Sequence, residues 1–310
     1  MIKHLNHTPV MINEALDGLN ITNGGLYVDC TFGAGGYTKA ILEKAECKVI
    51  AIDQDPSTQH FAEEIEKFYP GRLYYINANF RNLKNTISSF GLVDGVVYDL
   101  GVSSMQLDDV LRGFSFQGNA RLDMRMSGKG YDAYNFINES SEKELADIIY
   151  NYGGEHASRA VARKIIEQSK VAPIETTLEL ANIIRSVVKR KGRIDPATKT
   201  FQAIRIAVND ELAALEESLG NLEAVTKPSA RVSIVSFHEL EDSIVKKFFK
   251  NNSDEKKAIS KYKINNLEYT QPFKIITNKT IKPSRNEVLN NPRSRSARLR
   301  IAERVSYCAK

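Results

Sequence analysis

Three carboxylates, Asp29, Asp53 and Asp99, stand at the ends of short apolar runs in the first third of the 310-residue sequence. Glycines follow the first of them closely, at positions 33, 35 and 36. A glycine-rich turn lets the backbone bend sharply and lets a ligand approach without a Cβ in the way. Carboxylates beside such a turn repel a pyrophosphate and attract a cation. The pattern therefore predicts a site for a nucleoside-like ligand that carries positive charge.

The apolar runs that end in these acids predict parallel strands over 26–30, 48–53, 72–76 and 94–100. A helix from about residue 38 and another over 59–68 alternate with them, as in a doubly wound α/β sheet. Ligands of such sheets lie beyond the carboxyl ends of the strands, so we expect the acids to meet at one edge. A fifth strand over 231–237 and an antiparallel pair over 273–277 and 299–305 complete the predicted sheet.

The glycine spacing argues against a dinucleotide. The fingerprint G-x-G-x-x-G, begun at Gly33 and Gly35, needs glycine at position 38, where the chain has Thr38. S-adenosylmethionine, which carries a sulfonium and an ammonium, suits the acidic strand end at Asp29 better, and a dehydrogenase is disfavoured. Asp53 follows the turn at close to the ~20-residue spacing at which a carboxylate takes ribose hydroxyls.

Composition places the chain among soluble globular proteins, with 42% hydrophobic and 26% charged residues. No apolar run approaches the ~20 residues of a membrane helix, and the N-terminus lacks the apolar stretch of a secretion signal. The three cysteines, at positions 30, 47 and 308, form no C-x-x-C pair. We therefore expect a cytoplasmic protein without disulfides, without a metal site and without a membrane partner.

The strand–helix alternation stops between residues 105 and 199. Helices are predicted there over 141–150, with Ser140 or Ser141 as N-cap, and over 157–169 and 177–189. This predicts an inserted helical domain, 105–199, within a discontinuous sheet domain made of 1–104 and 200–310. In the second part, a long helix over 201–225 and a helix over 241–250 are expected, and 251–266 is expected to form a mobile loop.

Basic charge is concentrated near the C-terminus. Residues 271–310 hold ten Lys or Arg and two Asp or Glu, whereas the remainder holds 33 basic and 36 acidic residues. The local excess favours a polyanion partner, and a solvated basic rim on the sheet is the alternative.

Nine segments, taken together and in this order, resemble the bacterial RsmH (MraW) family. Its members methylate the exocyclic N4 of a specific cytosine in the decoding centre of 16S ribosomal RNA. The segments are HTPVM (7–11), DCTFGAGG (29–36), AIDQDP (51–56), DLGVSSMQLDD (99–109), RGFSF (112–116), LDMRM (122–126), PATKTFQAIRIAVNDEL (196–212), SFHELED (236–242) and NPRSRSARLR (291–300).

The resemblance implies a class I, Rossmann-like methyltransferase sheet with an inserted helical domain for substrate recognition. It implies S-adenosylmethionine as cofactor and 16S rRNA in the small ribosomal subunit as partner, and it leaves a homodimer open. The implied cofactor contacts are Gly35, Gly36, Tyr37, Asp53, Phe80, Asp99 and Gln106. The chain departs from the family pattern in having Tyr37 for His, Gly154 for Glu and Glu239 for Ser.

The sequence leaves several roles open. Asp99 can accept a hydrogen bond from the target amine or serve the cofactor, and the family favours the cofactor. His238 is a candidate general acid or base, an RNA contact, or a structural histidine. Phe80 is expected to cover the adenine or to belong to the core. Candidates for base stacking, or for ordinary core packing, are Phe114, Phe116 and Phe237. Candidates for phosphate contacts are Arg293, Arg295, Arg298 and Arg300.

Two other functions remain as alternatives at this stage. One is a methyltransferase that acts on DNA or on a protein. The other is an assembly factor whose cofactor pocket has degenerated, a reading to which the departure at Tyr37 lends some weight.

Overall fold

The computed structural model describes residues 9–190, 192, 194–253 and 271–306. The chain forms two compact units, one made of 1–101 and 212–310 and the other of 102–211. The first boundary falls close to the expected 104/105. The second falls later than the expected 199/200, because the helix over 197–209 packs with the helical unit.

The first unit is built on a seven-stranded sheet of order β3-β2-β1-β4-β5-β7-β6. Strands β1 to β5 are parallel, and β7 runs antiparallel to both β5 and β6. The predicted parallel strands and the closing antiparallel pair are thereby confirmed. The strand bounds are β1 Leu26–Asp29, β2 Lys48–Asp53, β3 Leu73–Asn77, β4 Val93–Asp99, β5 Thr226–Ser236, β6 Phe273–Ile275 and β7 Arg298–Arg304.

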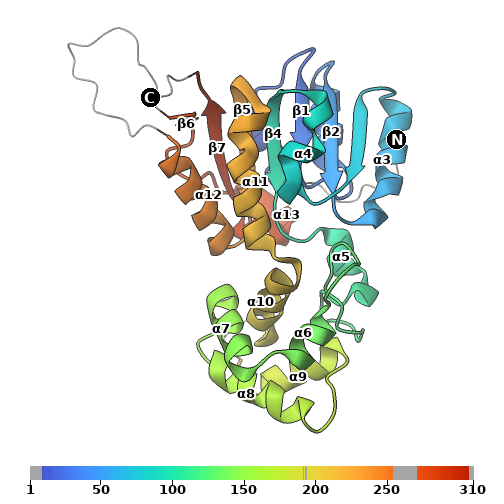
Figure 1. The fold of residues 1–310 in the computed structure, drawn as a ribbon, viewed down its shortest axis with the longest axis vertical. Coiled ribbons are helices and arrows are strands. Elements are labelled where there is room, and N and C mark those ends of the chain that lie inside the picture. The colour runs from blue at the N-terminus through green and yellow to red at the C-terminus, as the bar shows by residue number, and fades with distance from the viewer. Residues whose placement is uncertain (1–8, 191, 193, 254–270, 307–310) are drawn as a thin grey trace, which may run out of the picture. The chain divides into compact units, whose positions relative to one another are not determined.

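Alternating side chains of the strands fill two separate cores, one on each face of the sheet. In β1, for example, Tyr27 belongs to one core and Val28 to the other. One face is covered by α1 (Ile12–Leu19), α2 (Gly36–Lys44) and α3 (Gln59–Phe68). The other face is covered by α4 (Leu83–Thr86), α11 (Glu211–Val225) and α12 (Glu239–Asn251), of which α4 and α11 cross the sheet in Figure 1. Burial on both faces explains why these strands read as continuous apolar runs.

The second unit is helical and has its own core, centred on residues such as Leu145, Val161 and Ile184. Ser141 caps α7 as predicted, because its Oγ accepts the Glu144 N–H at 3.2 Å. The helices are α5 Ser104–Asp108, α6 Ala133–Glu139, α7 Glu142–Gly153, α8 Ser158–Ser169, α9 Thr177–Val187 and α10 Ala197–Asn209.

The prediction of a single long helix over 201–225 is wrong. Helix α10 ends at Asn209, Asp210 adopts a left-handed conformation with φ 48°, and α11 begins at Glu211. Aspartate tolerates this conformation better than most residues. The Asn209 amide stabilises the break, because it accepts the Met126 N–H and donates to the Met124 carbonyl, both at 2.7 Å.

Some sequence predictions fall outside the described residues. These are most of the mobile loop expected over 251–266, the first two residues of the segment 7–11, and Cys308. Within the part of the chain that the structure describes, no helix combines the length and the apolar character needed to cross a membrane.

Candidate active site

The glycine turn connects β1 to α2 and is tied to the neighbouring strand β2. The Gly33 N–H donates to Asp53 Oδ2 at 2.7 Å, and the Phe32 N–H donates to the Ile52 carbonyl at 3.0 Å. Gly35 has a φ of +78°, and a Cβ there would overlap Ile65 and Phe32. The turn therefore requires glycine at position 35 for its own packing, whatever ligand it faces.

Tyr37, in the first turn of α2, holds the segment that precedes α1. Its buried hydroxyl donates to the Val10 carbonyl, and Gly36 packs so closely on Pro9 that a Cβ would overlap the proline ring. Burial raises the pKa of Tyr37 well above its ordinary value, and the negative charges of Asp99 and Asp29 add to the effect. The phenol that replaces the family's histidine thus has a structural hydrogen bond at the mouth of the turn.

Glu287, in α13 (Arg285–Asn290), fixes the same segment from another direction. Its Oε1 accepts the Met11 N–H at 2.6 Å, where Met11 is left-handed with φ 52°. Sequence reasoning missed this contact, which joins residues 276 positions apart and leaves no local signal.

Asp29 and Asp53, at the ends of β1 and β2, both accept hydrogen bonds from the chain around the turn. Asp29 Oδ2 accepts the Thr38 hydroxyl at 2.8 Å, and Asp53 Oδ1 accepts the Asp55 N–H at 2.8 Å. Burial raises the pKa of each carboxyl to about 6 despite these hydrogen bonds. A carboxylate has about four acceptor positions, so Asp53 keeps acceptor capacity for ligand hydroxyls.

Asp99, at the end of β4, is the least satisfied of the acids. Its backbone N–H donates to the Thr31 hydroxyl at 2.7 Å, which places it beside the glycine turn. Its Oδ1 is buried and has no hydrogen-bond partner among the described residues. Burial raises the pKa of Asp99 well above its ordinary value, and the neighbouring charges of Asp29 and Glu241 raise it further. An unpartnered buried acceptor is costly unless a ligand satisfies it.

The acids at the ends of β1, β2 and β4 therefore lie together, as predicted from the strand ends. Among the described residues, no Lys, Arg or His forms an ion pair with Asp29, Asp53 or Asp99. Clustered carboxyls with raised pKa values and no cationic partner are suited to a ligand that brings positive charge. The three carboxyl groups of Asp29, Asp53 and Asp99 fit the sulfonium and ammonium of S-adenosylmethionine.

Phe80 and Gln106 have partners of their own. The half-buried Phe80 ring follows β3 and packs edge-on against Tyr98, with ring centroids 5.8 Å apart. Gln106 belongs to the helical unit, where its Oε1 accepts the Ser103 N–H at 3.1 Å in a capping box of α5. Gln106 is buried, and its contact with a cofactor stays a prediction.

His238 is the N-cap of α12. Its Nδ1 accepts the Glu241 N–H at 3.4 Å, and its Nε2 lies 3.0 Å from Glu241 Oε1. Glu241 Oε2 in turn accepts the Phe237 N–H at 2.8 Å. The Nδ1 contact agrees with a structural role for His238, but its buried Nε2 has no hydrogen-bond partner among the described residues, so a role toward a ligand stays a prediction. Glu241 was missed, although its place three residues after the cap is the signature of a capping box.

The three phenylalanines considered for base stacking are packed to different degrees. Phe114 is a core residue of the helical unit, 7% exposed. The ring of Phe116 packs against Phe201 at 4.9 Å, and the Arg185 guanidinium lies over it at 5.6 Å. Phe237 is partly buried against the core beneath α1. Ordinary packing accounts for Phe114 most completely.

Two of the four arginines considered for phosphate contacts form ion pairs within the protein. Arg298 donates to Asp242 Oδ2 at 3.0 Å, and Arg300 donates to both oxygens of Asp242 at 2.7 and 3.1 Å. Burial acts to raise the pKa of Asp242, but the two arginines outweigh it and hold that pKa below its ordinary value. Arg293 and Arg295 are exposed in a 3₁₀ turn over Pro292–Ser296.

The two other departures from the family pattern are compatible with the fold. Gly154 ends α7 in a left-handed conformation with φ +61°, where glycine is the favoured residue. Glu239 is exposed in the first turn of α12, where the helix dipole favours a negative charge.

The strand order, the antiparallel β7 beside β5, and the glycine turn with acids at the carboxyl ends of the strands define a class I, Rossmann-like methyltransferase domain. The chain carries a helical insertion between β4 and β5 of this domain.

The chain belongs to the MraW methylase family, whose model matches residues 4–305. Curated relatives include ribosomal RNA small subunit methyltransferase H of Rickettsia africae, 51% identical over 97% of this chain and 98% of the relative. The protein of the same name from Rickettsia canadensis is 52% identical over 97% of this chain and 98% of the relative.

Solved structures of lower similarity include an rRNA methylase from Streptococcus thermophilus, with TM-score 0.42 and 10% identity over 99% of both chains. TrmN from Thermus thermophilus has TM-score 0.43 and 9% identity, over 95% of this chain and 48% of the other. Similarity at this level does not extend to function.

Proposed function

We propose that this protein is an S-adenosylmethionine-dependent methyltransferase of 16S ribosomal RNA, acting on the exocyclic N4 of a specific cytosine in the decoding centre. Membership of the MraW methylase family and the names of the relatives support the rRNA substrate. The observation that carries the site assignment is the buried, unpartnered Oδ1 of Asp99 among acids with raised pKa values. The cytosine N4 target rests on the resemblance of the sequence motifs to the RsmH family.

The residues at the carboxyl ends of β1, β2 and β4 would hold the cofactor. Asp53 offers its remaining acceptor positions to ribose hydroxyls, and Asp29 and Asp99 supply negative charge toward the cationic groups. Gly35 and Tyr37 shape the turn beneath them, and Phe80 offers a half-buried ring for the adenine. When bound, the cofactor supplies a methyl group that is activated by its attachment to a sulfonium.

The target amine is a weak nucleophile, because the N4 lone pair is delocalised into the cytosine ring. Asp99 can accept one N–H of that amine through Oδ1 and so hold the nitrogen in a geometry that favours attack. Its raised pKa also makes the carboxylate a better acceptor for the proton that the nitrogen loses. Positioning supplies most of the acceleration in this scheme.

The helical unit, 102–211, is our candidate for recognition of the RNA around the target. The target base must leave its stack to reach a methyl group held among the buried acids. As an enzyme of ribosomal RNA the protein would act in the cytoplasm, on the small subunit or its RNA.

Mass mapping of 16S rRNA tests the substrate. Cells that lack the gene should have one unmethylated cytosine N4 in the decoding centre, and the wild-type gene should restore the methyl group. An unchanged rRNA mass map would overturn the rRNA assignment and return attention to DNA or protein substrates.

The variant Asp99→Asn separates the two roles of this carboxyl. If Asp99 serves the amine, the turnover number falls while the calorimetric Kd for S-adenosylmethionine stays close to that of the wild type. If Asp99 serves the cofactor, the Kd rises. Asp94→Asn is the matched control, because Asp94 lies at the opposite end of the same strand and pairs with Lys227 at 2.8 Å. No detectable cofactor binding by the wild type would exclude the enzyme and favour a degenerate pocket.

A further inference from the structure

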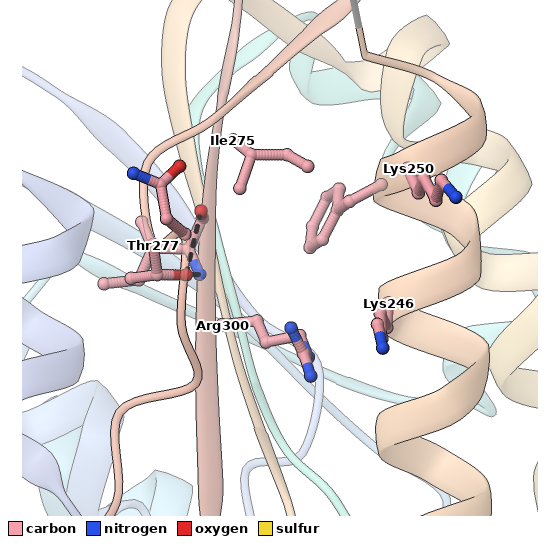
Figure 2. Close-up of a pocket in the computed structure, with 8 residues that line it drawn as sticks. Lys246, Lys250, Ile275, Thr277 and Arg300 are labelled. Atoms are coloured by element: carbon pink, nitrogen blue, oxygen red, sulfur yellow. Dashed lines mark hydrogen bonds between the residues drawn. The ribbon is translucent and has the colours of Figure 1, made fainter. Parts of the chain in front are cut away.

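A pocket of about 160 Å³ opens in the sheet unit between α12 and the last two strands, β6 and β7. Figure 2 shows Lys246 and Lys250 along the wall formed by α12, with Ile275 and Thr277 on the opposite wall and Arg300 between them. Its volume is several times the ~30 Å³ that one water occupies in the liquid, so it has room for a phosphate group.

The two lysines are uncompensated cations. Lys246 and Lys250 are exposed, one helical turn apart on the same face of α12, and neither forms an ion pair or hydrogen bond with any described residue. Like charges at this spacing repel each other by a few tenths of a kcal/mol. Lys250 lies in the last turn of α12, where the helix dipole favours a positive charge, whereas Lys246 lies outside that turn.

Arg300 completes the cationic lining in a fixed orientation. Two of its donors, Nε and Nη2, bind Asp242 at 2.7 and 3.1 Å, which holds the guanidinium plane in place. Its third nitrogen, Nη1, donates to no residue in the described ranges. Asp242 is also shared with Arg298, so the three side chains carry a net positive charge at this edge of the sheet.

We propose that this pocket binds a backbone phosphate of ribosomal RNA, at a site separate from the place of methyl transfer. The inference deepens the proposed function and rests on it. Charge complementarity selects the occupant: Lys246 and Lys250 supply the unpaired charges, Arg300 supplies a fixed donor, and Phe249 and Ile275 supply an apolar floor for the attached ribose.

The position of the pocket suits RNA that extends away from the target base. α12 begins at the carboxyl end of β5, next to His238, and a helix rises 1.5 Å per residue. Lys246 and Lys250 therefore lie roughly 12 and 18 Å along the helix from that end. The site thus contacts nucleotides beyond the one that is modified. Of the four arginines considered for phosphate contacts, Arg300 lines it.

The salt dependence of RNA binding tests the proposal. The double variant Lys246→Ala/Lys250→Ala should bind a single-stranded RNA of the decoding region more weakly, with a slope of log K against log salt reduced by about 0.7, the value for one lost phosphate contact. The control is Lys247→Ala/Lys67→Ala, which removes the same charge from exposed lysines outside the pocket. Equal slopes and equal affinities for the two double variants would overturn the site.

A second measurement locates the contact without substitution. Acetylation of the wild-type protein with an N-hydroxysuccinimide ester, read by mass spectrometry, should slow several-fold at Lys246 and Lys250 when RNA is bound, and remain unchanged at Lys247. Unchanged reactivity at all three lysines, with RNA bound, refutes the site while leaving the proposed function intact. A wild type whose RNA affinity does not depend on salt also overturns the site, whereas the proposed function is overturned only by an unchanged rRNA mass map.

Discussion

The raised pKa values at the strand ends predict that cofactor affinity depends on pH. Burial holds the pKa of Asp29 and of Asp53 at about 6, so both are mostly ionised at pH 7 and mostly protonated at pH 5. A ligand that brings positive charge favours the ionised carboxyls and lowers their pKa values. Binding below about pH 6 therefore releases protons, and affinity rises as pH rises.

The size of the effect follows from the ionised fractions. A carboxyl with a pKa of about 6 is ionised in roughly one molecule in eleven at pH 5 and in nine of ten at pH 7. If the cofactor needs Asp53 ionised, its Kd should be about tenfold higher at pH 5 than at pH 7. If the cofactor needs both Asp29 and Asp53 ionised, the ratio of the two Kd values rises toward about a hundredfold. The two carboxyls then titrate as a coupled pair, because each lies in the field of the other.

Calorimetry with S-adenosylmethionine between pH 5 and pH 7 measures this directly, and buffers of different ionisation enthalpy report the protons released. Asp53→Asn removes one of the titrating groups, so it should weaken binding at pH 7 and reduce the remaining pH dependence by about tenfold. The reasoning is refuted if the wild-type affinity is the same at pH 5 and pH 7, or if Asp53→Asn retains the full pH dependence.

Three further substitutions test the local structure, each by urea unfolding of variant and wild type. Gly35→Ala should lower the free energy of unfolding by about 2–5 kcal/mol, because φ is +78° and the added Cβ would overlap Ile65; a cost below 1 kcal/mol would contradict the packing of the turn. Tyr37→Phe should cost about 1–3 kcal/mol by leaving the Val10 carbonyl without its donor, and no loss would show that the carbonyl finds another partner. Asp242→Asn should cost about 2–3 kcal/mol near neutral pH by breaking its pairing with two arginines. Because the Asp242 carboxyl has a lowered pKa in the folded state, its stabilisation is present above about pH 4 and disappears as pH falls below that, and a constant difference between variant and wild type down to pH 2 would count against the ion pairs.

The order of elements was predictable because it depends on local patterns. The run Lys48–Asp53 is apolar on both faces and becomes β2 with the same bounds. The helix predicted over 59–68 is α3, Gln59–Phe68. The break at Asp210 was not predictable, because the apolar period continues through it. Asn209 stabilises the break by contacts with Met124 and Met126, which are remote in sequence.

The candidate site was predictable only as a set of positions. Strand ends and glycine spacing identify Asp29, Asp53 and Asp99, because parallel strands bring their carboxyl ends to one edge. The protonation behaviour of these acids was not predictable, since it follows from burial and from charges on other elements, among them Glu241 of α12. The excess of basic residues near the C-terminus can be counted in the sequence. Which of these residues face solvent could not be predicted from it.

The amino-acid sequence alone thus determined the sheet, the insertion, the acids that end its strands and the family to which the chain belongs, because apolar period, glycine spacing and motif order are all written along the chain. Only the tertiary structure decided which polar and charged side chains have hydrogen-bond or ion-pair partners. Asp242 pairs with Arg298 and Arg300 across more than fifty positions, whereas Lys246 and Lys250 of the same helix form no ion pair with any described residue. Hydrogen bonding and burial depend on distances between elements, and those distances exist only once the chain has folded.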